Sequence, residues 1–191
     1  MKRVKKGQFG YIKYRRIFHL ILAIVMYAMA VILYFAGIKA TGDNKNVLTI
    51  AAILGCLPAS QSLVTAILGF RVKCCEKNLF EEIEKRLEDN MLSAYDLYFT
   101  TYDKNYPVSH IIMKNNCLCG LMEQSKHSTN DLEKYLEETF TKNGIKGISI
   151  KIFEKSMSEK YLNRINELKK LEYEKSVMED EVKRLLFDIT Y

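Results

Sequence analysis

Two long apolar runs near the start of the chain constrain its fold more than any other feature. They cover residues 17–38 and 47–70, and a short polar link, residues 39–46, separates them. As helices that rise about 1.5 Å per residue, the runs would reach about 33 and 36 Å, enough to cross a hydrocarbon core of about 30 Å. The sequence therefore predicts an N-terminal transmembrane hairpin.

The basic residues that flank the hairpin predict its orientation. Residues 1–16 contain seven Lys/Arg and no acid, and more basic residues follow the second run, whereas the link contains only Lys39 and Lys45. By the positive-inside rule both termini face the cytoplasm, which predicts a multi-pass protein of the cell membrane. We expect the leader, residues 1–16, to lie on anionic lipid headgroups through its basic side chains, which are Lys2, Arg3, Lys5, Lys6, Lys13, Arg15 and Arg16.

The net charge of +6 does not predict a nucleic-acid-binding surface, because the basic excess belongs to the membrane flanks. Residues 72–191 hold 19 Lys/Arg against 22 Asp/Glu. Nucleic acid is therefore not an expected partner. The five cysteines would lie in lipid or in a reducing compartment, so they do not indicate a disulfide framework.

A cleaved signal peptide is the alternative interpretation of the first run. Residues 28–30, Ala-Met-Ala, resemble a small-residue cleavage site after a basic start and an apolar stretch. The run continues at full hydrophobicity through residues 31–35, however, which favours an uncleaved anchor.

The second apolar run carries small and polar residues at steps of three and four along one side. Facing lipid they would be costly, so we expect them to pack against the first helix or against another subunit of a homo-oligomer. A pore lined by this stripe is an alternative, although neither run contains Asp, Glu, Lys or Arg to mark an ion path. The stripe consists of Gly55, Pro58, Gln61, Ser62 and Thr65.

The segment after the hairpin predicts one small cytosolic domain of the α+β class. Its apolar spacing changes from helical to alternating and back, which places the α+β domain at residues 71–155 and an amphipathic C-terminal helix at residues 156–191. The expected elements are a helix at 78–92, strands at 95–102, 107–113 and 117–122, a helix that is capped within 128–131 and stops at 143–144, and a strand at 148–152.

The C-terminal helix is predicted to run over residues 156–187, with an apolar seam that is interrupted around residues 172–175. It is either a coiled-coil arm or a helix whose first half packs on the sheet while its second half meets solvent or a partner. We expect any protein partner to bind through this helix.

The order helix, three strands, helix, strand is similar to the core of restriction-endonuclease-like nucleases. That resemblance implies an acid on the second strand and an acid-x-Lys pair on the third, around Mg²⁺. Residues 108–113 contain no acid, and Glu123 and Lys126 are three apart, which puts them on opposite faces of a strand. The remaining catalytic candidates are Asp96, Asp103, Glu123 and Lys126, and they do not form a convergent set.

A metal centre or a cysteine nucleophile is not predicted either. His110, Cys117, Cys119 and His127 lie on or beside the expected hairpin, but Cys-x-Cys in a strand sends both thiols to one face, where they behave as small apolar side chains. A third group to orient a Cys-His pair cannot be named. The chain has no phosphate loop or dinucleotide fingerprint, so no cofactor is expected.

The sequence Tyr-Ile-Lys-Tyr-Arg-Arg at residues 11–16, the polar link, Leu-Pro-Ala at residues 57–59 and a cytosolic tail of about 120 residues carry a further resemblance. The chain resembles an uncharacterised family of small two-helix membrane proteins from low-GC Gram-positive bacteria. The resemblance implies a bacterial source and the hairpin topology, and it implies no activity.

These observations favour a membrane-anchored, non-enzymatic binding or regulatory module on the cytosolic side. A membrane-tethered, degenerate nuclease-like hydrolase and an oligomeric two-helix pore are the alternatives.

Overall fold

The computed structural model describes residues 4–101, 104–123, 127–172 and 177–190, with side chains in the last range from Glu179 onward. The chain divides into two compact units. One is the hairpin, Ile12–Val72, and the other combines Met1–Tyr11 with Lys73–Tyr191. The second unit is called the α+β domain below.

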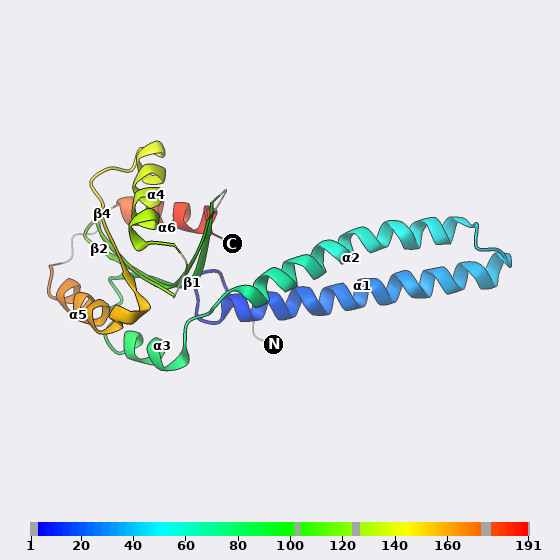
Figure 1. The fold of residues 1–191 in the computed structure, drawn as a ribbon, viewed down its shortest axis with the longest axis horizontal. Coiled ribbons are helices and arrows are strands. Elements are labelled where there is room, and N and C mark those ends of the chain that lie inside the picture. Colours follow the sequence, from blue (N-terminus) through cyan, green and yellow to red (C-terminus); the bar gives the residue numbers. More distant parts are fainter. Residues whose placement is uncertain (1–3, 102–103, 124–126, 173–176, 191) are drawn as a thin grey trace. The chain divides into compact units, whose positions relative to one another are not determined.

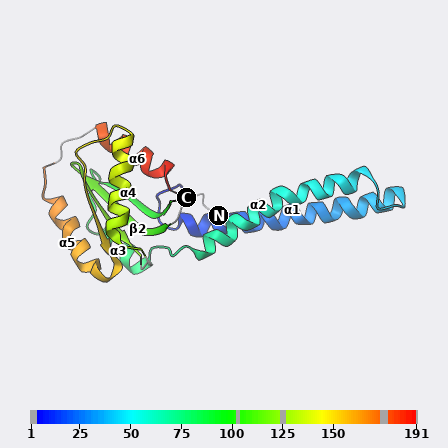
Figure 2. The same ribbon diagram turned by 45° about the horizontal axis from the view of Figure 1, so that its top comes forward.

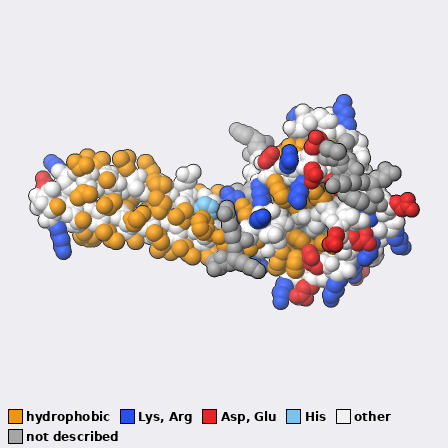
Figure 3. All heavy atoms as spheres, turned by 180° about the vertical axis from the view of Figure 1, so that it is seen from behind, with side chains coloured by type: hydrophobic (Ala, Val, Ile, Leu, Met, Phe, Trp, Pro, Cys, Tyr) orange, Lys and Arg blue, Asp and Glu red, His pale blue; other side chains and the backbone are white. Residues whose placement is uncertain are grey.

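The hairpin consists of two antiparallel helices, α1 (Tyr11–Thr41) and α2 (Val47–Arg71), which lie side by side (Figure 2). By length and composition, both are apolar enough to cross a membrane. Apolar side chains cover most of the visible surface of the pair (Figure 3). The link closes with a capped turn, because the side chain of Asn46 accepts a hydrogen bond from the backbone N–H of Thr49 at 2.8 Å.

Small residues spaced by seven form the seam between the two helices. A step of seven returns to nearly the same side of a helix, and small side chains let two backbones approach closely. Beside the seam, the hydroxyl groups of Tyr27 and Ser60 form a hydrogen bond of 2.7 Å between the helices. The buried seam residues are Ala23, Ala30 and Gly37 on α1 and Ala52, Ala59 and Ala66 on α2.

The polar stripe expected to pack this hairpin does not form the centre of the contact. Gly55, Ser62 and Thr65 are half-buried beside the alanine seam, and a side chain added at Gly55 would meet open space. Pro58 and Gln61 are exposed. Alanine takes the central positions because its side chain is small and carries no polar group that needs a partner.

The α+β domain is built on a four-stranded sheet with the order β1-β2-β3-β4. The first three strands, β1 (Leu92–Thr100), β2 (Asn105–Lys114) and β3 (Cys117–Met122), form an antiparallel meander. Helix α4 (Thr129–Lys142) then crosses to β4 (Ser149–Glu154), which is parallel to β3. The α+β class is confirmed, as is the succession along the chain of three strands, a helix and a fourth strand.

Helices cover both faces of the sheet (Figures 1 and 2). Helices α4 and α6 (Val177–Asp188) pack on one face, where Leu136, Phe140, Val182 and Leu186 join the core. Helices α3 (Lys77–Glu84) and α5 (Ser158–Lys169) pack on the other, where Ile83, Tyr161 and Ile165 are buried.

Two helices differ from the sequence-based expectation. The helix expected over residues 78–92 ends at Glu84, and Leu92, at its expected end, pairs with Met113 as the first residue of β1. The single C-terminal helix expected over residues 156–187 is a short 3-10 turn (Lys155–Met157) followed by α5 and α6. One straight helix could not place apolar residues on both faces of the sheet, as these two do.

Candidate functional site

Asp96 joins two segments of the α+β domain, one that precedes α1 in the sequence and one that follows α2. Its Oδ2 accepts the backbone N–H of Gly10 at 2.7 Å, and its Oδ1 accepts that of Cys75, also at 2.7 Å. Gly10 precedes α1 and Cys75 follows α2, although the two are far apart in sequence. Asp96 itself is buried within β1, in a left-handed conformation with φ of 53°. We call Asp96, Gly10 and Cys75 the Asp96 junction.

The described part of the leader packs against the rest of the α+β domain. The backbone N–H of Tyr95 on the edge strand β1 donates to the carbonyl of Gly7 at 2.8 Å. The Lys6 ammonium donates to the carbonyls of Phe187 and Thr190 at the end of α6. The Phe9 ring stacks on Phe80 with centroids 4.2 Å apart. Lys2 and Arg3 lie outside the described residues.

Gly7 is suited to this docking for two reasons, and its substitution gives a first prediction. Its φ is +83°, and an added Cβ would lie 2.5 Å from Cζ of Phe187. Gly10 has a similar φ of +81° but open space around it. We expect Gly7→Ala to lower the free energy of unfolding of the domain by about 2 kcal/mol, and Gly10→Ala by about 1 kcal/mol, the cost of the conformation alone.

Urea unfolding of the full chain measures the loss of stability in each variant. Hydrogen exchange at the Tyr95 amide reports on the docking of the leader. Equal losses for Gly7→Ala and Gly10→Ala would contradict the close contact with Phe187.

Glu123, another of the candidate acids, is also held by hydrogen bonds within the domain. Its side chain is 3% exposed and accepts hydrogen bonds from the Ser109 hydroxyl at 2.6 Å and from the Lys155 ammonium at 3.0 Å. Lys155 also pairs with Glu76, and this contact lowers the pKa of the Glu76 carboxyl. Ser109 occupies a bulge in β2, which turns its side chain toward Glu123.

The catalytic candidates therefore do not converge on an open site. Each carboxylate oxygen of Asp96 and of Glu123 accepts a hydrogen bond from the domain, which is the role expected of buried acids in a folded core. Asp103 and Lys126 lie outside the described residues. Within the described ranges, no three His, Cys, Asp or Glu side chains are grouped so that they could hold a metal ion.

A hydrogen-bonded chain runs from Ser93 through His110 to Tyr161. The Ser93 hydroxyl lies 2.8 Å from Nε2 of His110, and the Tyr161 hydroxyl lies 2.6 Å from Nδ1. Burial lowers the pKa of His110 to about 3, so the imidazole is neutral near pH 7. Among the described residues, the Tyr161 hydroxyl has no other hydrogen-bond partner. It therefore donates to Nδ1, and Nε2–H donates to Ser93, the reverse of what would activate a serine nucleophile.

The cysteines do not provide a nucleophile in the domain's interior. Burial, together with the nearby Asp96 carboxylate, raises the pKa of Cys75 to about 12. Burial also raises the pKa of Cys119. Thiols that stay protonated at neutral pH are poor nucleophiles and poor metal ligands.

The hollow that best suits a ligand lies between the leader, α3 and β1. It has a volume of about 510 Å³ and combines apolar walls with a few polar groups, which is typical of a binding site. The Glu84 carboxylate lies at its rim and accepts a hydrogen bond from the Tyr95 hydroxyl at 2.7 Å. We call this hollow the leader groove; its lining includes Gln8, Phe9, Phe80, Glu84, Leu87, Ser93 and Tyr95.

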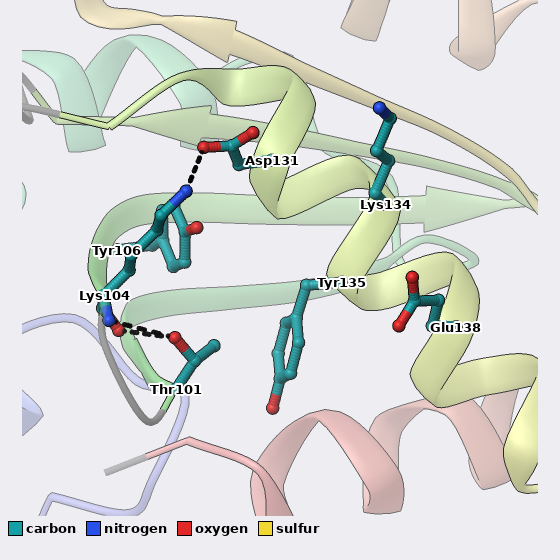
Figure 4. A pocket seen from close by; sticks show the side chains of 7 residues that line it. All are labelled: Thr101, Lys104, Tyr106, Asp131, Lys134, Tyr135 and Glu138. Carbon is teal, nitrogen blue, oxygen red and sulfur yellow. Dashed lines mark hydrogen bonds and ion pairs between the residues drawn. The ribbon is translucent and has the colours of Figure 1, made fainter.

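A second hollow, of about 340 Å³, lies where the β1–β2 hairpin meets α4 (Figure 4). Two of its charged side chains already pair: the Lys104 ammonium reaches the Asp131 carboxylate at 2.6 Å, and this pairing lowers the pKa of Asp131. The backbone of Lys104 is tied to the Thr101 side chain. This hollow is more polar than the leader groove, and several of its polar groups already bind one another.

Comparisons with known proteins do not extend this description. No family model matches the chain, and neither a curated protein nor a solved structure matches it.

Sequence reasoning missed Gly7, Phe9, Cys75 and Lys155 as parts of one structural unit. A glycine and an aromatic residue within a basic leader are the signal that could have indicated docking, because lipid headgroups require neither. Asp96 was named as a candidate, but for a chemical role that its contacts do not support.

Proposed function

We propose that this protein is a membrane-anchored, non-enzymatic binding module, with both termini and the α+β domain on the cytoplasmic side. The basic flanks support this orientation. The resemblance to small two-helix membrane proteins of low-GC Gram-positive bacteria agrees with such an anchor.

The leader groove carries the binding part of the proposal. Among the described residues of the α+β domain, the only large hydrophobic residues classed as exposed are Met157 and Leu171, which are 43% and 44% exposed. The groove is therefore the place where the domain offers apolar surface in a concave form. The Glu84 carboxylate at its rim favours a partner segment whose apolar anchor is flanked by hydrogen-bond donors or a basic residue.

Helix α6, in the second half of the expected C-terminal helix, is poorly suited to bind a protein partner. Helix α6 turns Val182 and Leu186 into the core and leaves mainly charged residues outside, among them Glu181, Lys183 and Arg184. We therefore place the partner contact at the groove. Removing residues 172–191 would unfold the domain and would not test partner binding selectively.

In-cell photocrosslinking tests the groove. A photoreactive amino acid at Leu87, in the groove, should capture a discrete partner, whereas the same group at the exposed Glu159 on α5 should not. Leu87→Glu should abolish partner capture through a crosslinker at a neighbouring groove position while leaving membrane retention intact. Equal capture at Leu87 and Glu159, or none at either, would contradict the proposal.

A second candidate, a nuclease-like hydrolase, is favoured only by the order of its elements. The meander and the parallel β3–β4 pair agree with the αβββαβ order that the sequence analysis compared with restriction-endonuclease-like cores. Cleavage of nucleic acid with Mg²⁺ or Mn²⁺ that is lost in Glu123→Gln would support this candidate. If neither Mg²⁺ nor Mn²⁺ supports cleavage, nuclease activity on these substrates is excluded.

A further inference from the structure

Gln61 places a primary amide on the exposed side of α2, well inside the apolar stretch. It lies 14 residues after Val47 and 10 before Arg71, hence about 21 and 15 Å from the two helix ends. In a spanning helix this position is deep within the hydrocarbon core. An amide without a hydrogen-bond partner is costly there.

The first helix cannot supply that partner. Each residue advances about 100° around a helix, so the Gln61 side chain points about 160° away from Ala59, on the seam that faces α1. Gln61 is exposed while Ala59 is fully buried. The hydrogen bond between the two helices is made instead by Tyr27 and Ser60.

Pro58 adds a second unsatisfied group to the same side of α2. Proline has no N–H, so the helix cannot provide the usual donor to the carbonyl of Leu54. Leu54 is 60% exposed and points within about 20° of Gln61. A second copy packed on this side of α2 would keep both polar groups away from lipid.

We propose that the hairpin forms a parallel homodimer through the side of α2 centred on Gln61. A second copy in the same orientation brings another Gln61 to the same depth, and an amide both donates and accepts, so two identical amides satisfy each other across a two-fold axis. Leu57 and Leu68, both exposed on this side, surround the amides with apolar contact. This inference rests on the membrane anchoring in the proposed function.

Neighbouring cysteine substitutions test the face. Leu68 and Ile67 are 49% and 48% exposed, but Leu68 points within about 20° of Gln61 and Ile67 about 120° away. In liposomes that contain the full chain, a thiol crosslinker should join Leu68→Cys into dimers and leave Ile67→Cys at the background set by the native cysteines. Equal crosslinking at both positions would overturn the proposal.

Substitution of the amide tests its role. Energy transfer between labelled chains, measured at decreasing protein-to-lipid ratios, should show a dimer affinity about 3- to 30-fold lower for Gln61→Leu. Gln61→Asn keeps an amide on a shorter side chain, so its dimer affinity should fall less than that of Gln61→Leu. Unchanged affinity in Gln61→Leu would overturn the proposal.

The remaining outcomes separate the dimer from the anchor and from a pore. Wild-type protein that alkaline carbonate extracts from membranes would overturn the anchoring itself, and the dimer with it. Assemblies larger than two copies that conduct ions and lose conductance in Gln61→Leu would overturn the dimer in favour of a pore. Carbonate-resistant protein that crosslinks only as dimers supports both proposals.

Discussion

Asp96→Ala is expected to destabilise the α+β domain by about 4 kcal/mol. The substitution removes two hydrogen bonds to a carboxylate, from Gly10 and from Cys75, each worth about 1.5–3 kcal/mol when the acceptor is charged. It also leaves their N–H groups without an acceptor and places alanine at a φ of 53°, which Asp and Asn tolerate better.

Hydrogen exchange at Gly10 and Cys75, combined with urea unfolding of the full chain, measures this loss. Asp96→Asn keeps the left-handed conformation and one acceptor oxygen, so it should lose about half as much. Asp89→Ala, an exposed acid in the loop before β1, is the matched control and should change stability by less than about 0.5 kcal/mol. Faster exchange at Cys75 with slow exchange at Gly10 would contradict a carboxylate that holds both segments.

The Asp96 junction also explains why this residue matters to the proposed function. Because one carboxylate binds the backbone of Gly10 and that of Cys75, these two segments of the domain are fixed to the same point of β1. The leader docks beside that point and forms one wall of the leader groove. A loss of the junction should therefore loosen the groove as well, so partner capture at Leu87 should weaken in Asp96→Ala.

Regular patterns made much of this fold predictable. Two apolar runs of sufficient length predict the helices of the hairpin, and alternation of Ile148, Ile150 and Ile152 predicts the last strand. The tight turn between β2 and β3 was predictable because Asn tolerates positive φ, and Asn115 and Asn116 have φ values of 48° and 60°.

Contacts between distant residues were not predictable in the same way. The hydrogen bond from Gly10 to Asp96 joins residues 86 positions apart, and no local pattern encodes it. Lys114, the last residue of β2, is 1% exposed, and its ammonium group meets Glu88 and the carbonyl of Lys169. Its long side chain reaches these partners only because α5 packs on that face of the sheet.

The candidate site was predicted least well, because the type of a residue does not reveal whether its polar atoms already bind partners within the fold. Asp96 and Glu123 have the chemistry of metal ligands, but the structure gives their oxygens to backbone N–H groups, a hydroxyl and an ammonium group. Burial of an acid with a full set of donors is a structural role, and only the fold shows whether the donors are present.

Acid should destabilise the domain through His110. The imidazole is completely buried among the Ser93 hydroxyl, the Tyr161 hydroxyl and the Tyr95 ring, whose centroid lies 4.4 Å away. Burial lowers its pKa to about 3, whereas the unfolded chain has a histidine pKa of about 6.5. Between these values the unfolded state binds one more proton, so stability falls as the pH falls.

The expected slope from this one group is about 1.4 kcal/mol per pH unit, or about 3 kcal/mol between pH 6 and pH 4. Other acids, such as Asp131 and Glu76 with their lowered pKa values, add to the acid loss, so the wild-type curve alone does not isolate His110. His110→Gln keeps hydrogen-bonding capacity without a titratable ring, and its stability should fall less steeply by that amount. Urea midpoints of both proteins at half-unit pH steps measure the difference. Parallel curves would show that the imidazole can be protonated without unfolding, and hence that the face of the sheet beneath α5 opens to water.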